Sequence, residues 1–156
     1  APVRLTVRDC AIAPAVAVVR GAGGALEVQT QDDAAHAVVL DELGPLGAQG
    51  LAAGAPRSTT RARLPAWGHT ISLPLPDAGV RRVVADGGDP AYVVVTEEDA
   101  ALTGDDGAAA LEQVPAGTYT VLAWLPPSAG QPAVLATGQA TVVAGARAEL
   151  TLKLGS

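Results

Sequence analysis

Two histidines supply all the imidazole groups of this chain of 156 residues, at positions 36 and 69. Asp33 precedes His36 by three residues, within a short acidic turn. Imidazole nitrogens and carboxylate oxygens can together bind Cu(II) or Zn(II), so His36, His69 and Asp33 are the candidate metal ligands, with copper or zinc as the candidate cofactor. The alternative is that both histidines are partly exposed or hydrogen-bonded within the core, and that the protein has no cofactor.

The remaining reactive groups do not form a catalytic arrangement. Cys10 follows Asp9, whose negative charge disfavours a thiolate, so we interpret Cys10 as a small buried apolar residue rather than a nucleophile or ligand. Adjacent carboxylates such as Glu97 and Glu98 point to opposite faces of a strand, and no nucleophile motif surrounds Ser58. The sequence therefore predicts no catalytic residues and a protein that is not an enzyme.

The composition excludes several classes of protein. Ten basic against sixteen acidic side chains give a net charge of −6, which leaves no broad basic surface for nucleic acid. With 49% apolar and 17% charged residues, the chain is too hydrophobic to be disordered. No apolar run reaches the ~20 residues that span a bilayer. Eighteen glycines and twelve prolines indicate many turns, so we expect a folded protein of short elements.

Apolar side chains alternate with polar ones along much of the chain, which is the pattern of half-buried β-strands. Val3, Leu5 and Val7 form the first such series. Turn clusters rich in glycine, proline and aspartate separate the series, and no segment keeps a helical apolar period. We therefore predict an all-β protein that forms a β-sandwich or a β-barrel. Further strands are expected at 15–20, 25–30, 36–40, 69–73, 80–85, 91–96, 118–125, 133–143 and 148–154.

The stretch 41–68 differs from the rest because it combines many glycines and prolines with few strand-forming residues. We predict a long loop here, which is uncommon inside a compact domain unless the loop packs as a unit or serves a function. Trp67 and Leu51 are its candidate partner-binding residues, because such a tryptophan can anchor a protein partner. The alternatives are a tolerated surface insertion and a tryptophan that packs the loop onto the sheet.

A recognisable pattern of turns and strands occupies the C-terminal part of the chain. Residues 102–107 read LTGDDG and residues 114–124 read VPAGTYTVLAW. The aspartate–glycine pair closes a tight hairpin, and Tyr119 begins an alternating strand. This pattern resembles carboxypeptidase-regulatory-like (transthyretin-like) β-sandwich domains. The resemblance implies a domain of that kind over 97–156.

A second resemblance concerns the N-terminal part, where Thr30, Asp32 and His36 follow one another at short spacing. The spacing resembles the N-x-D-x-x-x-H stretch that carries the first copper-ligand histidine of cupredoxin-like periplasmic proteins, with Thr30 in place of the asparagine. The second ligand cluster of that family, C-x-x-H-P-x-M, falls at 85–90, which here reads ADGGDP. The resemblance implies a degenerate cupredoxin-like domain over 1–96, which is a Greek-key β-sandwich with most of the usual copper ligands missing. Blue-copper electron transfer is therefore not expected.

The order of the two halves also resembles exported bacterial proteins of the methylamine-utilisation type. This resemblance implies that the cupredoxin-like sandwich packs against the smaller transthyretin-like one, in a periplasmic or extracellular protein. We expect a non-enzymatic binding or structural module of the bacterial cell envelope, whose partner is another envelope protein rather than nucleic acid or a membrane. The alternatives are a copper- or zinc-binding protein that uses His36 and His69, and an accessory subunit of a periplasmic enzyme complex.

Overall fold

The computed structural model describes residues 3–9, 11–47, 51, 55–104, 106–127 and 132–153. The chain divides into two compact units, of which unit 1 comprises Ala1–Leu46 and Leu51–Leu102, and unit 2 comprises Gly47–Gly50 and Thr103–Ser156. The described residues form eleven strands and no helix, so none of them belongs to a helix that could cross a membrane. The predicted all-β fold class is confirmed.

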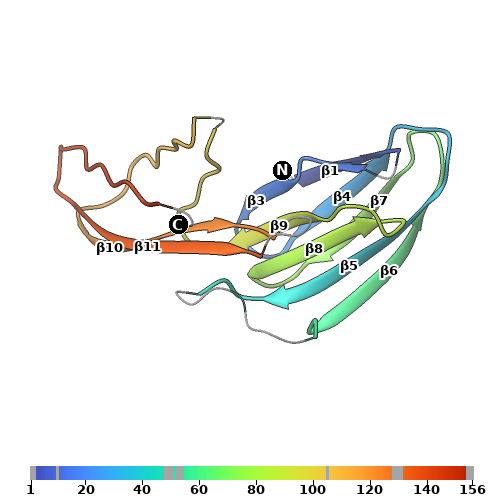
Figure 1. Cartoon of the computed structure of the whole chain (residues 1–156), viewed down its shortest axis with the longest axis horizontal. Helices are drawn as coiled ribbons and strands as arrows, with labels where there is room; N and C mark the ends of the chain where they lie inside the picture. The colour runs from blue at the N-terminus through green and yellow to red at the C-terminus, as the bar shows by residue number, and fades with distance from the viewer. Residues whose placement is uncertain are drawn as a thin grey trace. The chain divides into compact units, whose positions relative to one another are not determined.

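Unit 1 is a sandwich of two β-sheets (Figure 1). Its strands are β1 (Val3–Arg8), β2 (Ala11–Ala13), β3 (Val16–Arg20), β4 (Gly24–Thr30), β5 (His36–Gly44), β6 (Ser58–Leu64), β7 (Thr70–Leu75), β8 (Gly79–Ala85) and β9 (Ala91–Thr96). One sheet has the order β2-β1-β4-β7 and the other the order β3-β9-β8-β5-β6. Consecutive strands such as β4 and β5 lie in different sheets, so the chain crosses repeatedly between the two layers.

The core of unit 1 follows from the alternation seen in the sequence. Leu5 of β1 and Val28 of β4 are paired in a parallel register and are fully buried. Val38 of β5 and Val93 of β9 belong to the same buried cluster from the opposite sheet. The inward side chains of both sheets therefore form one continuous apolar layer, which contributes most of the free energy of folding.

Unit 2 contains an antiparallel hairpin of β10 (Gly117–Leu125) and β11 (Val134–Val142). The hydroxyl of Tyr119 at the start of β10 donates a hydrogen bond of 2.6 Å to the carbonyl oxygen of Pro115. The strand expected at 148–154 was wrong for the part that the structure describes, because residues 148–153 do not pair with a strand. The transthyretin-like sandwich over 97–156 stays a prediction.

The loop expected over 41–68 is shorter than the sequence indicated. β5 continues to Gly44, and β6 occupies 58–64, where Glu42 pairs with Ser58 and His36 pairs with Leu64. The glycine content had suggested a loop, but Gly44 ends β5 beside a register shift and has a φ of 91°, which suits glycine. The contact boundary between the units lies at 102/103, whereas the sequence had suggested 96/97. Cys10 lies outside the described residues.

Leu26 is fully buried in β4, so its truncation tests whether the sandwich core is packed as described. We expect Leu26→Ala to lower the free energy of unfolding by about 3 kcal/mol, because it leaves a cavity between the sheets. Leu111→Ala is the control, since Leu111 is 47% exposed and its truncation should change stability by less than about 0.5 kcal/mol. Urea unfolding of the three proteins provides the measurement. Equal losses from the two substitutions would contradict this core.

Candidate functional site

The imidazole of His36 is held between two carboxylates at one end of unit 1. Its ring is 3% exposed, and its Nε2 lies 2.8 Å from Oδ1 of Asp32. Its Nδ1 makes a short contact with Oδ2 of Asp86. His36 is the first residue of β5, Asp32 lies in the connection from β4, and Asp86 follows the last residue of β8. The register of β5 against β8 therefore brings together residues that are fifty positions apart in the chain. We call Asp32, His36 and Asp86 the His36 cluster.

Both carboxylates of the His36 cluster are also fixed by main-chain donors. The N–H groups of Asp9 and Ala34 donate to Asp32, at 2.8 Å and 3.1 Å. The N–H of Ala37 donates to Oδ1 of Asp86 at 2.8 Å, and the N–H of Asp86 donates to the carbonyl oxygen of Ala37 at 2.8 Å. The carboxylates therefore keep their places independently of the imidazole, which makes them preorganised acceptors for its two N–H groups.

These contacts favour the charged forms of all three groups. The hydrogen bond from the main chain of Asp9, followed by the one from His36, lowers the pKa of Asp32 well below its ordinary value. The hydrogen bond to Asp86 raises the pKa of His36, with a further contribution from Asp32, although burial of the ring opposes the shift. Because each ring nitrogen faces a carboxylate oxygen, these contacts favour the doubly protonated imidazolium over the neutral ring.

Unusual backbone conformations concentrate around the His36 cluster. Four non-glycine residues of the described chain have a positive φ, and three of them border this cluster: Asp9 at 51°, Asp86 at 52° and Trp67 at 61°. L-residues adopt this region at a steric cost of about 1–3 kcal/mol each, so the surrounding contacts must hold them there. Such clustering of strained residues is typical of functional regions, and it draws attention to Trp67.

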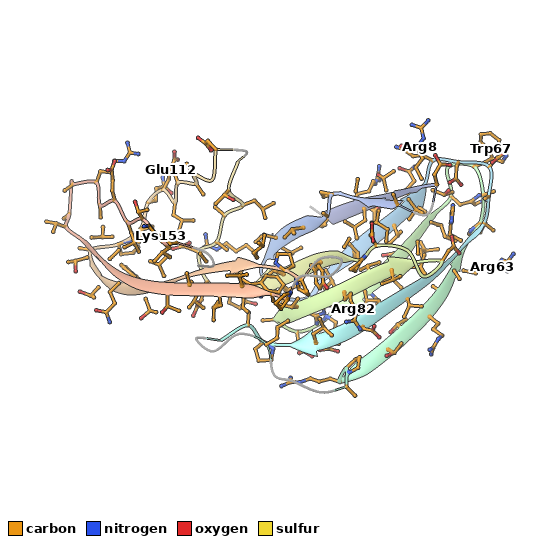
Figure 2. All side chains as sticks on the ribbon, in the orientation of Figure 1. Arg8, Arg63, Trp67, Arg82, Glu112 and Lys153 are labelled. Atoms are coloured by element: carbon orange, nitrogen blue, oxygen red, sulfur yellow. The ribbon has the colours of Figure 1, made fainter. Side chains whose placement is uncertain are left out.

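Trp67 is presented to solvent on a turn that the His36 cluster anchors. The main-chain N–H of Trp67 donates to the carbonyl oxygen of Asp32 at 3.0 Å. The main-chain N–H of Thr30 donates to the carbonyl oxygen of His69 at 3.1 Å. The indole itself is 72% exposed. Figure 2 shows Trp67 at the same end of unit 1 as Arg8 and Arg63. We refer to residues 66–69 as the Trp67 turn.

The three predicted metal ligands differ in burial and in hydrogen-bond partners. His36 is buried and binds Asp32 rather than Asp33, which is exposed. His69 is exposed, and its Nδ1 donates to the carbonyl oxygen of Ala66 in the same turn. Within the described ranges, no three His, Cys, Asp or Glu side chains are placed to hold a metal ion together. A shared metal site of His36, His69 and Asp33 stays a prediction.

The donor groups of the His36 cluster do not fit a blue-copper centre. Such a centre uses two imidazole nitrogens and a thiolate, whereas residues 85–90 contain no Cys, His or Met and both nitrogens of His36 already contact carboxylates. A metal ion at His36 would have to displace a proton and at least one carboxylate. We therefore derive no chemistry through copper at this position.

Sequence reasoning found part of this site and missed the rest. His36 and Trp67 were candidates, and Asp32 had been matched to the family pattern. Asp86 was missed as a partner of His36, although it stands where the resemblance places the second ligand cluster. Leu51, the other candidate for partner binding, is half-buried. Its role stays a prediction.

Comparison with known proteins assigns no family to the chain. No protein-family model matches it, and no curated protein matches it. Among solved structures, the chain is similar to the dithionite-reduced auracyanin of the photosynthetic bacterium Roseiflexus castenholzii, with 12% identity, a TM-score of 0.40, and coverage of 60% of this chain and 95% of that chain. Function is accordingly argued from the residues of this chain.

The charged state of His36 predicts how stability depends on pH. Because the folded-state pKa of His36 is raised, its contribution is complete below its ordinary value of 6.5 and is lost as the pH rises through the folded-state value. Asp32, whose pKa is lowered, stays ionised throughout this range. We expect His36→Gln to lower the free energy of unfolding by about 2 kcal/mol at pH 6, because it removes charge-assisted hydrogen bonds to two partly exposed carboxylates, and by less at alkaline pH.

Urea unfolding of both proteins between pH 6 and about pH 9 measures this difference. His69→Gln is the matched control, since His69 is exposed and faces a carbonyl oxygen rather than a carboxylate. A stability difference between the native protein and His36→Gln that stays constant over the whole range would contradict the charged cluster.

The alternative that the protein binds copper or zinc through His36 and His69 can be tested by adding the metals to the purified protein. We expect saturating Cu(II) or Zn(II) to cause no rise in melting temperature that depends on His36, because both ring nitrogens are already engaged. Thermal melts of untagged protein and of His36→Ala, combined with elemental analysis, provide the measurement. A stoichiometric metal content, with a melt shift that His36→Ala removes, would establish the copper- or zinc-binding alternative instead.

Proposed function

We propose that this chain is a non-enzymatic binding module that contacts a protein partner through the Trp67 turn. The observation that carries the proposal is the indole of Trp67, which is 72% exposed on a backbone of positive φ. An exposed indole leaves a large apolar surface in water, and its backbone conformation adds a steric cost. Burial of that surface against a partner would recover the first of these costs.

The anchoring of the Trp67 turn supports a preorganised contact. The turn is bound at both ends, through the N–H of Trp67 to Asp32 and through the carbonyl oxygen of His69 to Thr30. The side-chain amide of Gln29 also donates to the carbonyl oxygen of Gly68 at 3.4 Å. A side chain held in place before binding loses less conformational entropy on association, which is one reason tryptophans dominate many interfaces. The alternative role, in which Trp67 packs the loop onto the sheet, fits poorly with its exposure.

The placement of the His36 cluster supports a cupredoxin-like origin of unit 1 without copper chemistry. His36 starts β5, and Asp86 starts the β8–β9 turn, which are the two places where the resemblance puts copper ligands. Here an imidazolium and two carboxylates occupy them, and they hold loops together by charge. We infer that this end of the sandwich serves recognition rather than electron transfer.

The proposed cellular location of the module and the kind of partner it meets rest on the sequence resemblance. An exported protein of the bacterial envelope, periplasmic or extracellular, would meet another envelope protein as its partner. A partner that is itself an enzyme would make the chain an accessory subunit of a periplasmic complex, which remains the second form of the same proposal. The transthyretin-like character of unit 2, supported by the LTGDDG and VPAGTYTVLAW segments, belongs to this proposal.

Photo-crosslinking from position 67 tests the proposed contact. We expect a benzophenone amino acid in place of Trp67, in cells that produce the protein, to give a discrete adduct with one partner. The same group in place of Leu111, another partly exposed apolar side chain, is the control. Adducts at position 67 that are no more discrete than those at position 111 would overturn the proposal.

The purified partner then allows a quantitative comparison. Trp67→Gly should weaken its binding by at least about tenfold, because tryptophans at interface centres contribute strongly to affinity. Glycine adopts a positive φ without steric cost, so the turn should keep its conformation. Circular dichroism and the unfolding midpoint check that the variant is folded. Unchanged affinity in a folded Trp67→Gly protein would exclude the indole as the contact.

A further inference from the structure

β6 is an edge strand with an accessible backbone. It lies at the end of the order β3-β9-β8-β5-β6, so it pairs with β5 on one side only. Of its seven residues, Leu64 is buried, Ala62 is half-buried and the other five are exposed. An edge of this length presents alternate main-chain N–H and C=O groups that a further strand could bind.

This edge is also the most basic segment of an acidic chain. The sequence contains no Asp or Glu between Glu42 and Asp77, but it has Arg57, Arg61 and Arg63 in that interval. The whole chain carries a net charge of −6. The positive charges on and beside β6 therefore stand out against the overall charge and favour an acidic ligand at this edge.

The register places two of these arginines on one face. Arg61 pairs with Val39 and Arg63 with Ala37, so their side chains point to the same side of the sheet, opposite Leu64. Neither arginine forms an ion pair with any residue that the structure describes. Figure 2 shows Arg63 at the end of unit 1 that carries Trp67.

The neighbouring acids on β5 are engaged elsewhere. Asp41 binds Arg82 at 2.7 Å and accepts a hydrogen bond of 2.7 Å from the hydroxyl of Thr59. Glu42 lies 3.5 Å from Arg81 and accepts a hydrogen bond of 3.0 Å from the hydroxyl of Ser58. Arg61 attracts Asp41 electrostatically without forming an ion pair with it, so the guanidinium groups of Arg61 and Arg63 keep their donors for a ligand outside this sheet.

We propose that β6 binds an extended acidic segment of the partner by strand addition, with Asp or Glu at alternate positions of that segment. Side chains on one face of a strand recur every second residue, so carboxylates at that spacing come level with Arg61 and Arg63. The residues of the partner segment that alternate with its carboxylates lie beside Thr60 and Ala62 of β6, where small side chains fit. This inference rests on the proposed binding function and names the chemistry of its partner.

A second copy of this chain is a poor occupant of the same edge. Pairing β6 with β6 in the antiparallel sense brings Arg61 of one copy opposite Arg63 of the other when Ala62 faces Ala62, and like charges opposite each other destabilise a pair. Arginines on an edge can also serve only to prevent such pairing. That protective role is an outcome which the experiment separates from binding.

The probe is a fluorescently labelled synthetic peptide as long as β6, in which Glu alternates with Thr. Anisotropy titration at low salt with the full-length protein should show saturable binding. A peptide of the same composition with Glu at every third position should bind at least about tenfold more weakly, because no two of its carboxylates then have the two-residue spacing of Arg61 and Arg63.

Variants of the protein test the role of the two arginines. Arg61→Glu with Arg63→Glu should reduce binding by at least about tenfold through charge reversal at the contact. Arg147→Glu with Lys153→Glu makes the same change in net charge on exposed residues of unit 2, and it should change binding by less than about twofold. Equal losses in the two double variants would overturn the proposal in favour of attraction by net charge.

Two N-methylated peptides test the backbone contact without altering the protein. One carries the methyl groups on the Glu nitrogens and the other carries them on the Thr nitrogens. Only alternate N–H groups of an added strand face the edge, so at least one version must lose binding. Retention by both would overturn strand addition.

The failure of this inference can be told apart from failure of the proposed function. If no peptide binds while the crosslink from position 67 persists, the arginines of β6 only protect the edge and the binding function stands. If the crosslink is also absent, the binding function itself fails.

Discussion

A buried imidazole, hydrogen-bonded through each of its two nitrogens to a different carboxylate, holds one end of this sandwich together. Asp32 belongs to the β4–β5 connection, Asp86 to the β8–β9 turn, and the main chain of Asp9 to the end of β1. The imidazole lies between the two carboxylates, which are 13% and 30% exposed, and donates a hydrogen bond to each when it is charged. These connections, and the Trp67 turn that bonds to the main chain of Asp32, are therefore linked to one another through the His36 cluster.

This arrangement gives the chain a rigid end without a metal ion. The imidazolium provides positive charge at a fixed point, and the carboxylates are held by main-chain donors, so little reorganisation is needed when a partner arrives. The strained residues lie around this point because the cluster and its hydrogen bonds hold them. Recognition at the Trp67 turn and at the β6 edge would then use surfaces whose shapes are set before contact.

Much of the fold could be predicted from the sequence, because most strands have one buried face. Apolar alternation located β9 and β10 closely, whereas β6 was missed since its Ser, Thr and Arg side chains are mostly exposed. The series 148–154 also alternates, yet Leu150 and Leu152 pack over Gly138 of β11 without strand pairing in the described part. His36 could be suspected, but its pairing with Asp86 depends on the β5–β8 register, which no local pattern encodes.

The parallel pairing of β3 with β9 has a consequence for how the chain acquires its structure. Val18 of β3 pairs with Val94 of β9, so β3 finds this neighbour only after nearly all of unit 1 has been synthesised. Contacts between such distant residues have a high entropic cost of loop closure, so they slow folding. Unit 1 should therefore remain unfolded on the ribosome until residue 96 has emerged, and then fold as one cooperative step. Its basic edge strand would be exposed to other chains throughout that delay.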